Sequence, residues 1–216
     1  MEYAYQGENM TPSRCGRMDQ ACAFGSTPVE MTYDADNVDV CKIRVGKPLF
    51  YLIVDLGFAG KSTTKILQGL QQAYPFPQNA DQKNVHDLFG EFNLSITSEA
   101  VVALRQGDAK KLGQLMNKAQ AQFDKYAKPL CPEQLTMPVL YSLLCHPSIQ
   151  SYIFGGKGVG SQGDGKYSYL QTYPCQAQPT VKTYLMKIYL TQFFAFPLLV
   201  LDLVLPARYC TTIVQR

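Results

Sequence analysis

The sequence predicts an α+β fold in which strand-rich parts flank a long helical region. Its 216 residues are 46% hydrophobic and 17% charged, which suits a globular core and argues against disorder. A near-continuous apolar run at 49–56 is typical of a strand buried on both faces, and apolar residues recur at helical spacing between 81 and 147. From residue 49 onward we expect strand, helices, strand, strand, helix and strand. This β-α-β-β-α-β order is the ferredoxin-like split pattern with inserted helices.

The first 46 residues are expected to form a smaller α+β unit. Its predicted elements, in order, are a polar loop that enters a short helix at 12–25, a strand at 29–33 and a strand at 40–45. The turn-like sequence at 34–37 separates the two strands. Because Gly46, Lys47 and Pro48 then interrupt the pattern, we divide the chain into domains 1–46 and 47–216.

The second domain continues with helices and then returns to strands. We expect helices at 61–73, after Gly107-Asp108 and from 137 to 147, strands at 152–154 and 167–170, a helix at 180–189 and a strand at 196–204. The apolar stretch at 188–201 has 14 residues without a charge. A membrane helix needs about 20 apolar residues. We therefore interpret this stretch as a buried strand with its approach, and we expect no membrane partner.

Composition excludes several classes of function. The net charge of +3 is small and no block of Lys and Arg stands out, so a nucleic-acid partner is not expected. Seven cysteines without a C-x-x-C spacing indicate reduced thiols in a cytoplasmic protein rather than a disulfide framework or a zinc site. The two histidines, His86 and His146, are too far apart to suggest a metal pair, and no metal ligands are predicted. The N-terminus lacks the pattern of a signal peptide.

A first motif, Gly60-Lys61-Ser62, follows a predicted strand and precedes a predicted helix. This position invites a comparison with the phosphate-binding P-loop. The P-loop pattern needs a glycine five residues before Gly60, however, and that position is Asp55, whose carboxylate would repel phosphate. A simple turn with a positive residue at the helix start is the better interpretation, although Lys61 could still reach an anionic ligand.

A second motif is the glycine-rich segment at 155–165, which we expect to be a loop. It contains six glycines in eleven residues, and each glycine costs chain entropy on folding. Either the segment is a glycine-rich hairpin connection, or something approaches its backbone closely, as a phosphate or nucleotide would. A dinucleotide fingerprint is formally present at 158–163, but the sequence that follows predicts a strand rather than the required helix.

A third motif surrounds Asp19, close to Arg14 and Arg17. An Asp in the first turn of a helix usually complements the helix dipole, and this is the structural interpretation. The functional alternative is a carboxylate that holds or deprotonates a hydroxyl beside a basic pair. A general base of that kind contributes about 10²–10⁴-fold in rate.

Taken together, the second and third motifs resemble a known family. Residues 15–20, Cys-Gly-Arg-Met-Asp-Gln, resemble the G-x-x-D-Q segment of the GHMP kinases, the group that contains galactokinase and mevalonate kinase. Residues 155–165 resemble the family's C-terminal glycine-rich motif. The runs at 53–63 and 107–109 are similar to the sugar-kinase-like branch, and the resemblance covers roughly residues 1–205.

The resemblance implies a fold, an activity and a set of site residues. Domain 1–46 would be a remnant of an N-terminal α+β domain, ribosomal S5 domain 2-like, and domain 47–216 the C-terminal kinase domain. The implied activity is ATP-dependent transfer of the γ-phosphoryl group to a hydroxyl of a sugar or sugar-like molecule, with Mg²⁺ as cofactor. Asp19 would be the catalytic base or orienting group for that hydroxyl. The implied nucleotide-binding residues are Gly155, Gly156, Gly158, Gly160, Ser161 and Gly163.

Charge alone adds Arg14, Arg17 and Lys61 as candidate contacts for substrate or phosphate, with ordinary surface charge as the alternative for all three. The family's main ATP loop, P-x-x-x-G-L-G-S-S-A, is absent from the sequence before Asp19, and the tail beyond Pro206 has no counterpart in the family. We therefore expect a fragment whose partner is a missing N-terminal half or a second copy in a homodimer. The competing class is a non-catalytic binding module that keeps the kinase fold. The kinase hypothesis requires Asp19 and the glycines around 160 to converge on one cleft.

Overall fold

The computed structural model describes most of the chain. The described residues are 1–10, 17, 19–24, 27–34, 37–55, 62–158, 162, 167–172 and 210–214. Within them, the backbone alone is described for Glu8, Asp19, Cys22, Ala23, 52–55, 167–172 and 210–214. The predicted helix at 180–189 and the predicted strand at 196–204 lie outside the described residues.

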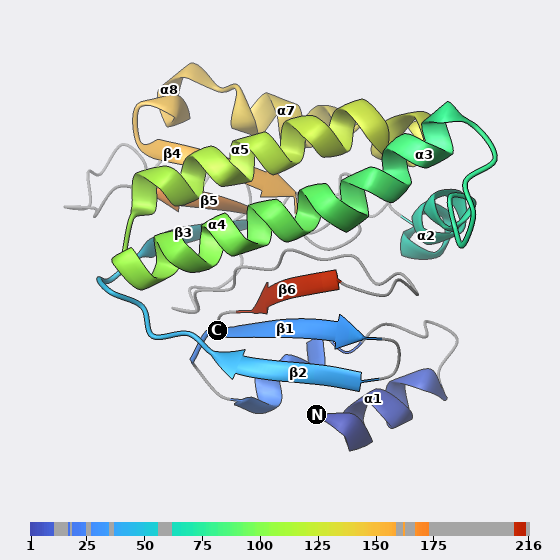
Figure 1. The fold of residues 1–216 in the computed structure, drawn as a ribbon. Helices are drawn as coiled ribbons and strands as arrows, with labels where there is room; N and C mark the ends of the chain where they lie inside the picture. Colours follow the sequence, from blue (N-terminus) through green and yellow to red (C-terminus); the bar gives the residue numbers. More distant parts are fainter. Residues whose placement is uncertain are drawn as a thin grey trace.

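Two antiparallel three-stranded sheets are present in the described part of the chain (Figure 1). The first sheet has the order β2-β1-β6 and contains β1 (Val29–Asp34), β2 (Asn37–Lys42) and β6 (Cys210–Val214). The second sheet has the order β3-β5-β4 and contains β3 (Phe50–Asp55), β4 (Ile153–Gly158) and β5 (Tyr167–Thr172). The mixture of helices and small sheets confirms the predicted α+β class.

The first hairpin is tighter than the sequence pattern predicts. Asp34 pairs with Asn37, so β2 begins within the predicted turn and ends at Lys42 instead of continuing to 45. Ile43 leaves the strand, and its N–H donates to the carbonyl of Pro28 at 2.8 Å. The Ile43 side chain is 1% exposed and packs among residues of the helices. The predicted end of the second strand, residue 45, was wrong because Ile43 turns away from the sheet and packs in the core between the helices.

The tail pairs with the start of the chain. Strand β6 runs antiparallel to β1, with Val29 opposite Val214 and Tyr33 opposite Cys210. Residues 210–214 belong to the predicted domain 47–216, yet they complete the sheet of the predicted domain 1–46. The domain division itself stays a prediction.

The second sheet contains half of the predicted split pattern. Strands β3 and β4 are each antiparallel to β5, so they are parallel to one another with β5 inserted between them. The connection from β3 to β4 is helical, as in a split βαβ unit. The second helix and fourth strand of the ferredoxin-like pattern fall outside the described residues.

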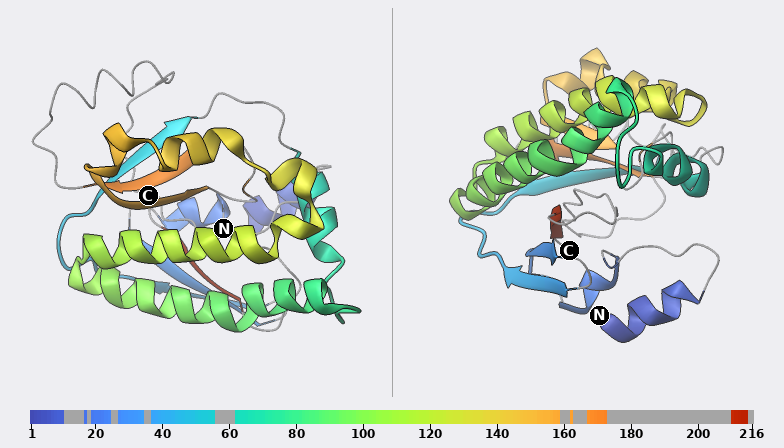
Figure 2. Two further views of the ribbon diagram at one scale, coloured as in Figure 1. Left: turned by 90° about the horizontal axis from the view of Figure 1, so that it is seen from above. Right: turned by 45° about the vertical axis from the view of Figure 1, so that its right-hand side comes forward.

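Helices pack against both sheets. They are α1 (Glu2–Asn9), η1 (Asp19–Phe24), α2 (Thr63–Gln71), α3 (Ala80–Asp87), η2 (Leu88–Phe92), α4 (Asn93–Gln106), α5 (Ala109–Tyr126), η3 (Lys128–Leu130), α6 (Pro132–Leu135), α7 (Pro138–Leu144) and α8 (Pro147–Gln150). Helices α4 and α5 lie side by side in Figures 1 and 2. Helix α5 contacts β4 and β5, whereas α4 contacts β6.

The two long helices are joined at a tight turn. Gly107 ends α4 in the left-handed conformation, with φ 66°, and a Cβ there would lie 2.5 Å from the backbone nitrogen of Lys47. Glycine is therefore required both by the φ angle and by the close passage of the chain at Lys47. The Gly46 N–H donates to the carbonyl of Leu104, which ties the segment that enters β3 to the end of α4.

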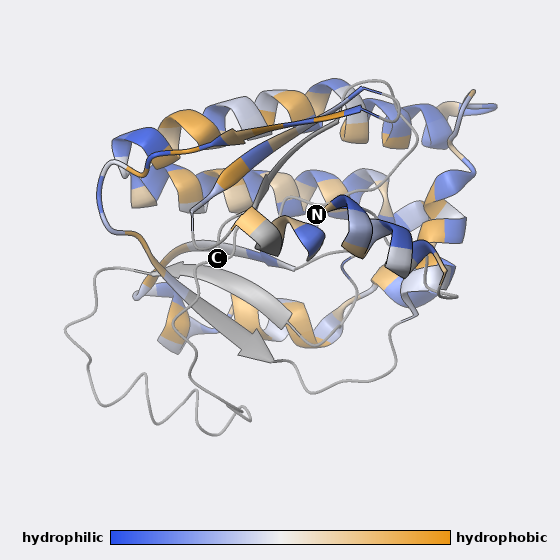
Figure 3. Cartoon of the chain, turned by 90° about the horizontal axis from the view of Figure 1, so that it is seen from below, coloured by the Kyte–Doolittle hydropathy of each residue, from blue (hydrophilic) through white to orange (hydrophobic). Residues whose placement is uncertain are grey.

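The core follows the predicted helical spacing. One cluster joins Ile43 to buried residues of α4 and α5, a second surrounds α2, α3 and the end of α5, and a third joins η1 to β1. Bands of hydrophobic and hydrophilic residues alternate along the helices (Figure 3). The predicted core residues Leu112, Leu115, Met116 and Phe123 are each at most 4% exposed, which confirms the apolar stripe of α5.

Replacing Asp108 is expected to weaken the start of α5. Its carboxylate Oδ1 accepts a hydrogen bond from the Lys111 N–H at 2.9 Å and so caps the helix. Loss of such a cap costs about 1 kcal/mol. Asp108→Ala should therefore lower the midpoint of urea unfolding, while Asp108→Asn, an equally good cap, should leave it nearly unchanged. Equal midpoints for Asp108→Ala and the native chain would contradict the capping role.

Candidate functional site

The glycine-rich segment begins as a strand rather than a loop. Gly155, Gly156 and Gly158 lie in β4, which pairs with β5 from Ile153 to Gly158 with a bulge before Gly155. The predicted loop over 155–165 was wrong for these first residues. The sequence pattern did not reveal a strand because glycine is depleted in strands.

Close approach of α5 explains one glycine of the strand. A Cβ on Gly155 would lie 2.0 Å from the carbonyl oxygen of Gly113 in α5, and a Cβ on Gly113 would lie 2.5 Å from the Cβ of Phe154. Both positions need glycine so that helix and strand backbones can touch. The close neighbour expected from the sequence is thus present at Gly155, and it is a helix of the same chain.

Side chains of α5 also occupy the outer edge of β4. Within the described sheet β4 is an edge strand, so alternate backbone N–H groups point away from β5. The Gly156 N–H donates to Asn117 Oδ1 at 3.0 Å, and the Gly158 N–H donates to Gln120 Oε1 at 2.9 Å. The side-chain oxygens of Asn117 and Gln120 on α5 thus pair with the N–H groups of Gly156 and Gly158 on β4. Covering an edge with a helix prevents its pairing with another chain.

Gly158 is held from several directions. Its carbonyl accepts a hydrogen bond from the Lys157 Nζ at 2.7 Å, and the Lys157 side chain is 5% exposed. Gln162, 4% exposed and with φ 66°, places its Oε1 2.2 Å from where a Cβ on Gly158 would lie. That oxygen has no hydrogen-bond partner among the described residues. A buried ammonium and a buried amide therefore both lie next to Gly158 at the end of β4.

The acceptor at Gln120 is itself fixed by a polar network. Gln120 Nε2 donates to Asp124 Oδ1 at 2.8 Å, and the Tyr141 side chain of α7 lies close to the same carboxylate. Burial raises the pKa of Tyr141 above its ordinary value, and the nearby Asp124 carboxylate raises it further. Tyr141 consequently stays neutral at physiological pH. This network connects α7 through α5 to the backbone of β4.

Arg17, a predicted anion contact, is engaged within the chain. Its Nε lies 3.1 Å from Glu2 Oε2, and its guanidinium carbon lies 3.8 Å from the centre of the Tyr5 ring. The hydrogen bond with Arg17 holds the pKa of the Glu2 carboxyl below its ordinary value. A phosphate at Arg17 would have to compete with this carboxylate, so the described contacts favour a role in holding α1.

The remaining predicted residues are placed only in part. Asp19 is the first residue of η1, whose residues Ala21 and Phe24 pack against β1 and β2 in the lower layer of Figure 1. Gly158 ends β4 in the upper layer, where its N–H binds a side chain of α5. The Asp19 side chain lies outside the described part, so the convergence of both on one cleft stays a prediction. The predicted residues Arg14, Lys61, Gly160, Ser161 and Gly163 also lie outside the described residues.

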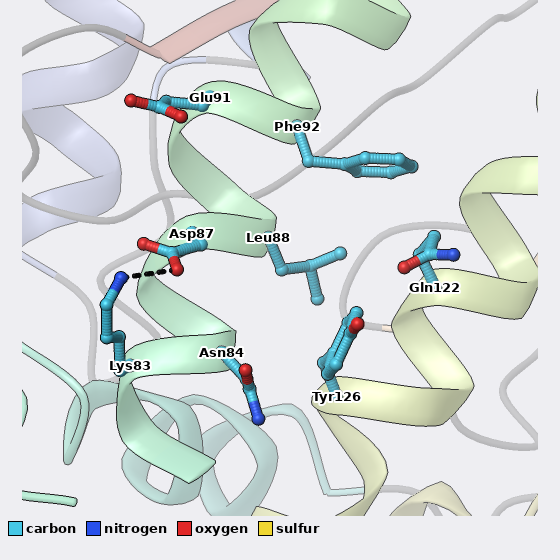
Figure 4. A pocket seen from close by; sticks show the side chains of 8 residues that line it. All are labelled: Lys83, Asn84, Asp87, Leu88, Glu91, Phe92, Gln122 and Tyr126. Carbon is cyan, nitrogen blue, oxygen red and sulfur yellow. Dashed lines mark hydrogen bonds and ion pairs between the residues drawn. The ribbon is translucent and has the colours of Figure 1, made fainter. Parts of the chain in front are cut away.

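A groove of about 510 Å³ lies elsewhere, between the α3–η2 segment and α5 (Figure 4). It is lined by Lys83, Asn84, Asp87, Leu88, Glu91, Phe92, Gln122 and Tyr126. Leu88 and Phe92 of η2 point across the gap toward the side of α5 that carries Tyr126, and Lys83 pairs with Asp87 at 2.6 Å (Figure 4). None of the predicted site residues that the structure describes lines this groove.

Sequence reasoning missed the polar residues of this site. Asn117 and Gln120 belong to a helix that was assigned to the core alone, and Lys157 was passed over within the glycine run. One signal could have found Gln120: it stands four residues after the buried Met116, inside the apolar stripe. A polar residue in such a stripe needs a buried partner.

The described residues fit ATP and Mg²⁺ only in part. The N–H groups of Gly156 and Gly158 are taken by α5, so they cannot also cradle a phosphate. The buried Lys157 ammonium supplies positive charge at the end of the strand. No group of three His, Cys, Asp or Glu side chains within the described ranges could hold a metal ion. We therefore assign no metal ligands.

None of the helices that the structure describes is long and apolar enough to cross a bilayer.

Comparison with known proteins supports the fold. No protein-family model matches the chain, and no curated protein matches it. Among solved structures, mevalonate kinase from L. major in complex with R-mevalonate matches with 20% identity and a TM-score of 0.56, over 98% of this chain and 56% of that chain. Galactokinase from Lactococcus lactis, complexed with galactose, matches with 15% identity and a TM-score of 0.41, over 83% of this chain and 48% of that chain.

These matches define what is shared. The chain spans about half the length of both kinases. The TM-score of the galactokinase match is too low to establish a common fold. The likeness to mevalonate kinase extends over nearly the whole chain, and at 20% identity it shows the fold alone. The chain thus has an α+β fold like that of this mevalonate kinase.

Proposed function

We propose that the protein is a GHMP-type kinase, which transfers the γ-phosphoryl group of ATP to a hydroxyl of a small molecule. The observation that carries this proposal is the likeness to mevalonate kinase over 98% of the chain, together with the two family-like motifs at 15–20 and 155–165. Neither alone is sufficient, because the identity is low and glycine-rich segments are common. Their agreement supports the same family by two routes.

The chemistry assigns different tasks to the residues. In phosphoryl transfer, positioning and electrostatic stabilisation supply most of the catalysis. Asp19 is proposed as the group that orients or deprotonates the acceptor hydroxyl. Gly160, Ser161 and Gly163 are proposed to contact the nucleotide, whereas Gly155 and Gly158 form the scaffold that holds them. Lys61 and Arg14 remain proposed anion contacts.

The acceptor is proposed to be a sugar or a related alcohol. The motif resemblance favours the sugar-kinase-like branch, while the solved structure with the higher TM-score is a mevalonate kinase bound to R-mevalonate. A hydroxy acid is therefore the alternative acceptor to be included in any test. Both acceptors can present a hydroxyl oxygen to the same phosphoryl donor.

A phosphorylation screen of the full-length protein that contains this chain tests the proposal. The protein is incubated with MgATP and either a panel of monosaccharides or R-mevalonate, and release of ADP is measured beside the mass of the product. We expect one acceptor class to gain a phosphate, which adds 80 Da, with one ADP formed per product. ATP hydrolysis without a phosphorylated acceptor, or no turnover with any of them, would contradict the kinase assignment.

A non-catalytic binding module with the kinase fold is the second candidate. It is favoured by the internal use of groups that could otherwise contact phosphate, namely the Gly156 and Gly158 amides and the Arg17 guanidinium. Calorimetric titration with MgATP, combined with the turnover assay, separates the candidates. A module would bind nucleotide or acceptor without turnover, whereas the kinase requires both binding and product.

A further inference from the structure

The outward-facing N–H at the end of β4 is bound by one buried side chain of α5, Gln120. Gln120 is 4% exposed and uses both ends of its amide, since Oε1 accepts from the Gly158 N–H and Nε2 donates to Asp124. An amide with both ends engaged has one fixed orientation. Gly158 is the last residue of β4, so this contact holds the end of the strand against α5.

Asn117 makes the corresponding hydrogen bond to Gly156, but its side chain is exposed to solvent. Its Oδ1 accepts from the Gly156 N–H. Water can replace an exposed acceptor, whereas removal of a buried acceptor leaves the donor unpaired. The two residues therefore differ in what their loss should do, although they bind the same strand edge.

We propose that Gln120 is a positioning residue for nucleotide binding, acting by holding the Gly158 amide at the end of β4. Asp124, one turn further along α5, keeps the Gln120 amide in place, so that α5 and the end of β4 form one connected support. The inference rests on the proposed kinase function. The inference adds Gln120 of α5, a residue outside both family-like motifs, to the residues proposed to support nucleotide binding.

The test compares Gln120→Leu with the native full-length protein. Affinity for MgATP is measured by calorimetry, and hydrogen exchange is followed in a peptide that covers β4. Gln120→Leu should weaken MgATP binding and accelerate exchange at Gly158, each by roughly tenfold, the order expected for one lost buried hydrogen bond. Asn117→Leu should change both by less than about threefold, because water replaces the exposed acceptor.

Two controls separate positioning from general stability. Gln114→Leu makes the same chemical change at an exposed position of α5 and should leave both readouts unchanged. Phe123→Leu removes volume from the α5 core and should lower the melting temperature without altering MgATP affinity. In a turnover assay, Gln120→Leu should raise the KM for ATP with little change in kcat. If Gln120→Leu does not fold, Gln120→Asn shortens the same amide by one methylene and should show the same direction of change.

The outcomes distinguish the two levels of the proposal. If the native protein binds MgATP and Gln120→Leu and Gln120→Asn bind it equally well, the positioning role is overturned and the kinase proposal stands. If Phe123→Leu weakens binding as much as Gln120→Leu, the effect is general destabilisation and the positioning role is again overturned. A native protein that does not bind MgATP overturns the proposed function and this inference together.

Discussion

Asp19→Ala is expected to lower kcat by about 10²–10⁴-fold while leaving the affinity for ATP nearly unchanged. A general base acts on the acceptor hydroxyl, and its removal costs a rate factor of this size. The nucleotide is bound by other groups, so its dissociation constant should not respond. Steady-state kinetics with saturating acceptor, together with a calorimetric titration of MgATP, measure the two quantities separately.

The competing explanation is that Asp19 only stabilises the start of η1, where it is the first residue. Asp19→Asn separates the two roles. Asparagine is as good as aspartate at a helix start, but it cannot accept a proton. The base hypothesis expects Asp19→Asn to be as inactive as Asp19→Ala, with a melting temperature close to native. Native turnover in Asp19→Asn would assign the residue to the helix start alone.

A carboxylate elsewhere in the same layer provides the matched control. Asp39 is exposed in β2 and is not part of any proposed contact. Asp39→Ala changes the net charge by the same amount as Asp19→Ala. Its kcat should remain native, so that any loss specific to Asp19→Ala cannot be attributed to charge.

Gly155→Ala should destabilise the protein more than an ordinary substitution does. The new Cβ would lie 2.0 Å from the carbonyl oxygen of Gly113, and both groups belong to backbones that cannot rotate away. Such overpacking costs about 1–3 kcal/mol or more. For a chain of this size, a loss of about 2–3 kcal/mol lowers the melting temperature by about 4–12 °C. Differential scanning calorimetry provides the measurement.

Gly7→Ala is the matched control for the Gly155 substitution. Gly7 lies within α1, and a Cβ there has no neighbour within 4 Å. Alanine in a helix is better than glycine by about 0.5–1 kcal/mol, so Gly7→Ala should be neutral or slightly stabilising. If Gly155→Ala melted like the native protein but lost affinity for MgATP, the glycine would be needed for a ligand and not for the helix contact.

Local patterns were sufficient for several elements of the fold. The apolar run at 49–56 predicted β3, and Asp108 before the stripe of Leu112 and Leu115 predicted the start and buried face of α5. Hydrophobic spacing and helix caps are local properties, so they can be read along the chain without its neighbours. The family-like motifs likewise pointed to the fold that the mevalonate kinase comparison supports.

The candidate site was less accessible from the sequence. The glycines at 155–158 were recognised as unusual, but they were expected in a loop that faces a ligand. Gly155 instead contacts Gly113, which stands 42 residues earlier in the chain (155 − 113). Gln120 gave only the weak signal of a polar residue in an apolar stripe. A glycine needed for close packing and a glycine needed for a ligand have the same sequence pattern.

By itself, the sequence determined the α+β class, the buried face of α5 and the two motifs that suggest a kinase. Only the tertiary structure decided that β6 pairs with β1, that α5 covers the edge of β4, and that Gln120 holds Gly158. The physical reason is that periodicity and capping depend on neighbours along the chain. Strand partners and buried hydrogen bonds depend on residues that are far apart in the chain. A single sequence does not show which of these residues come together.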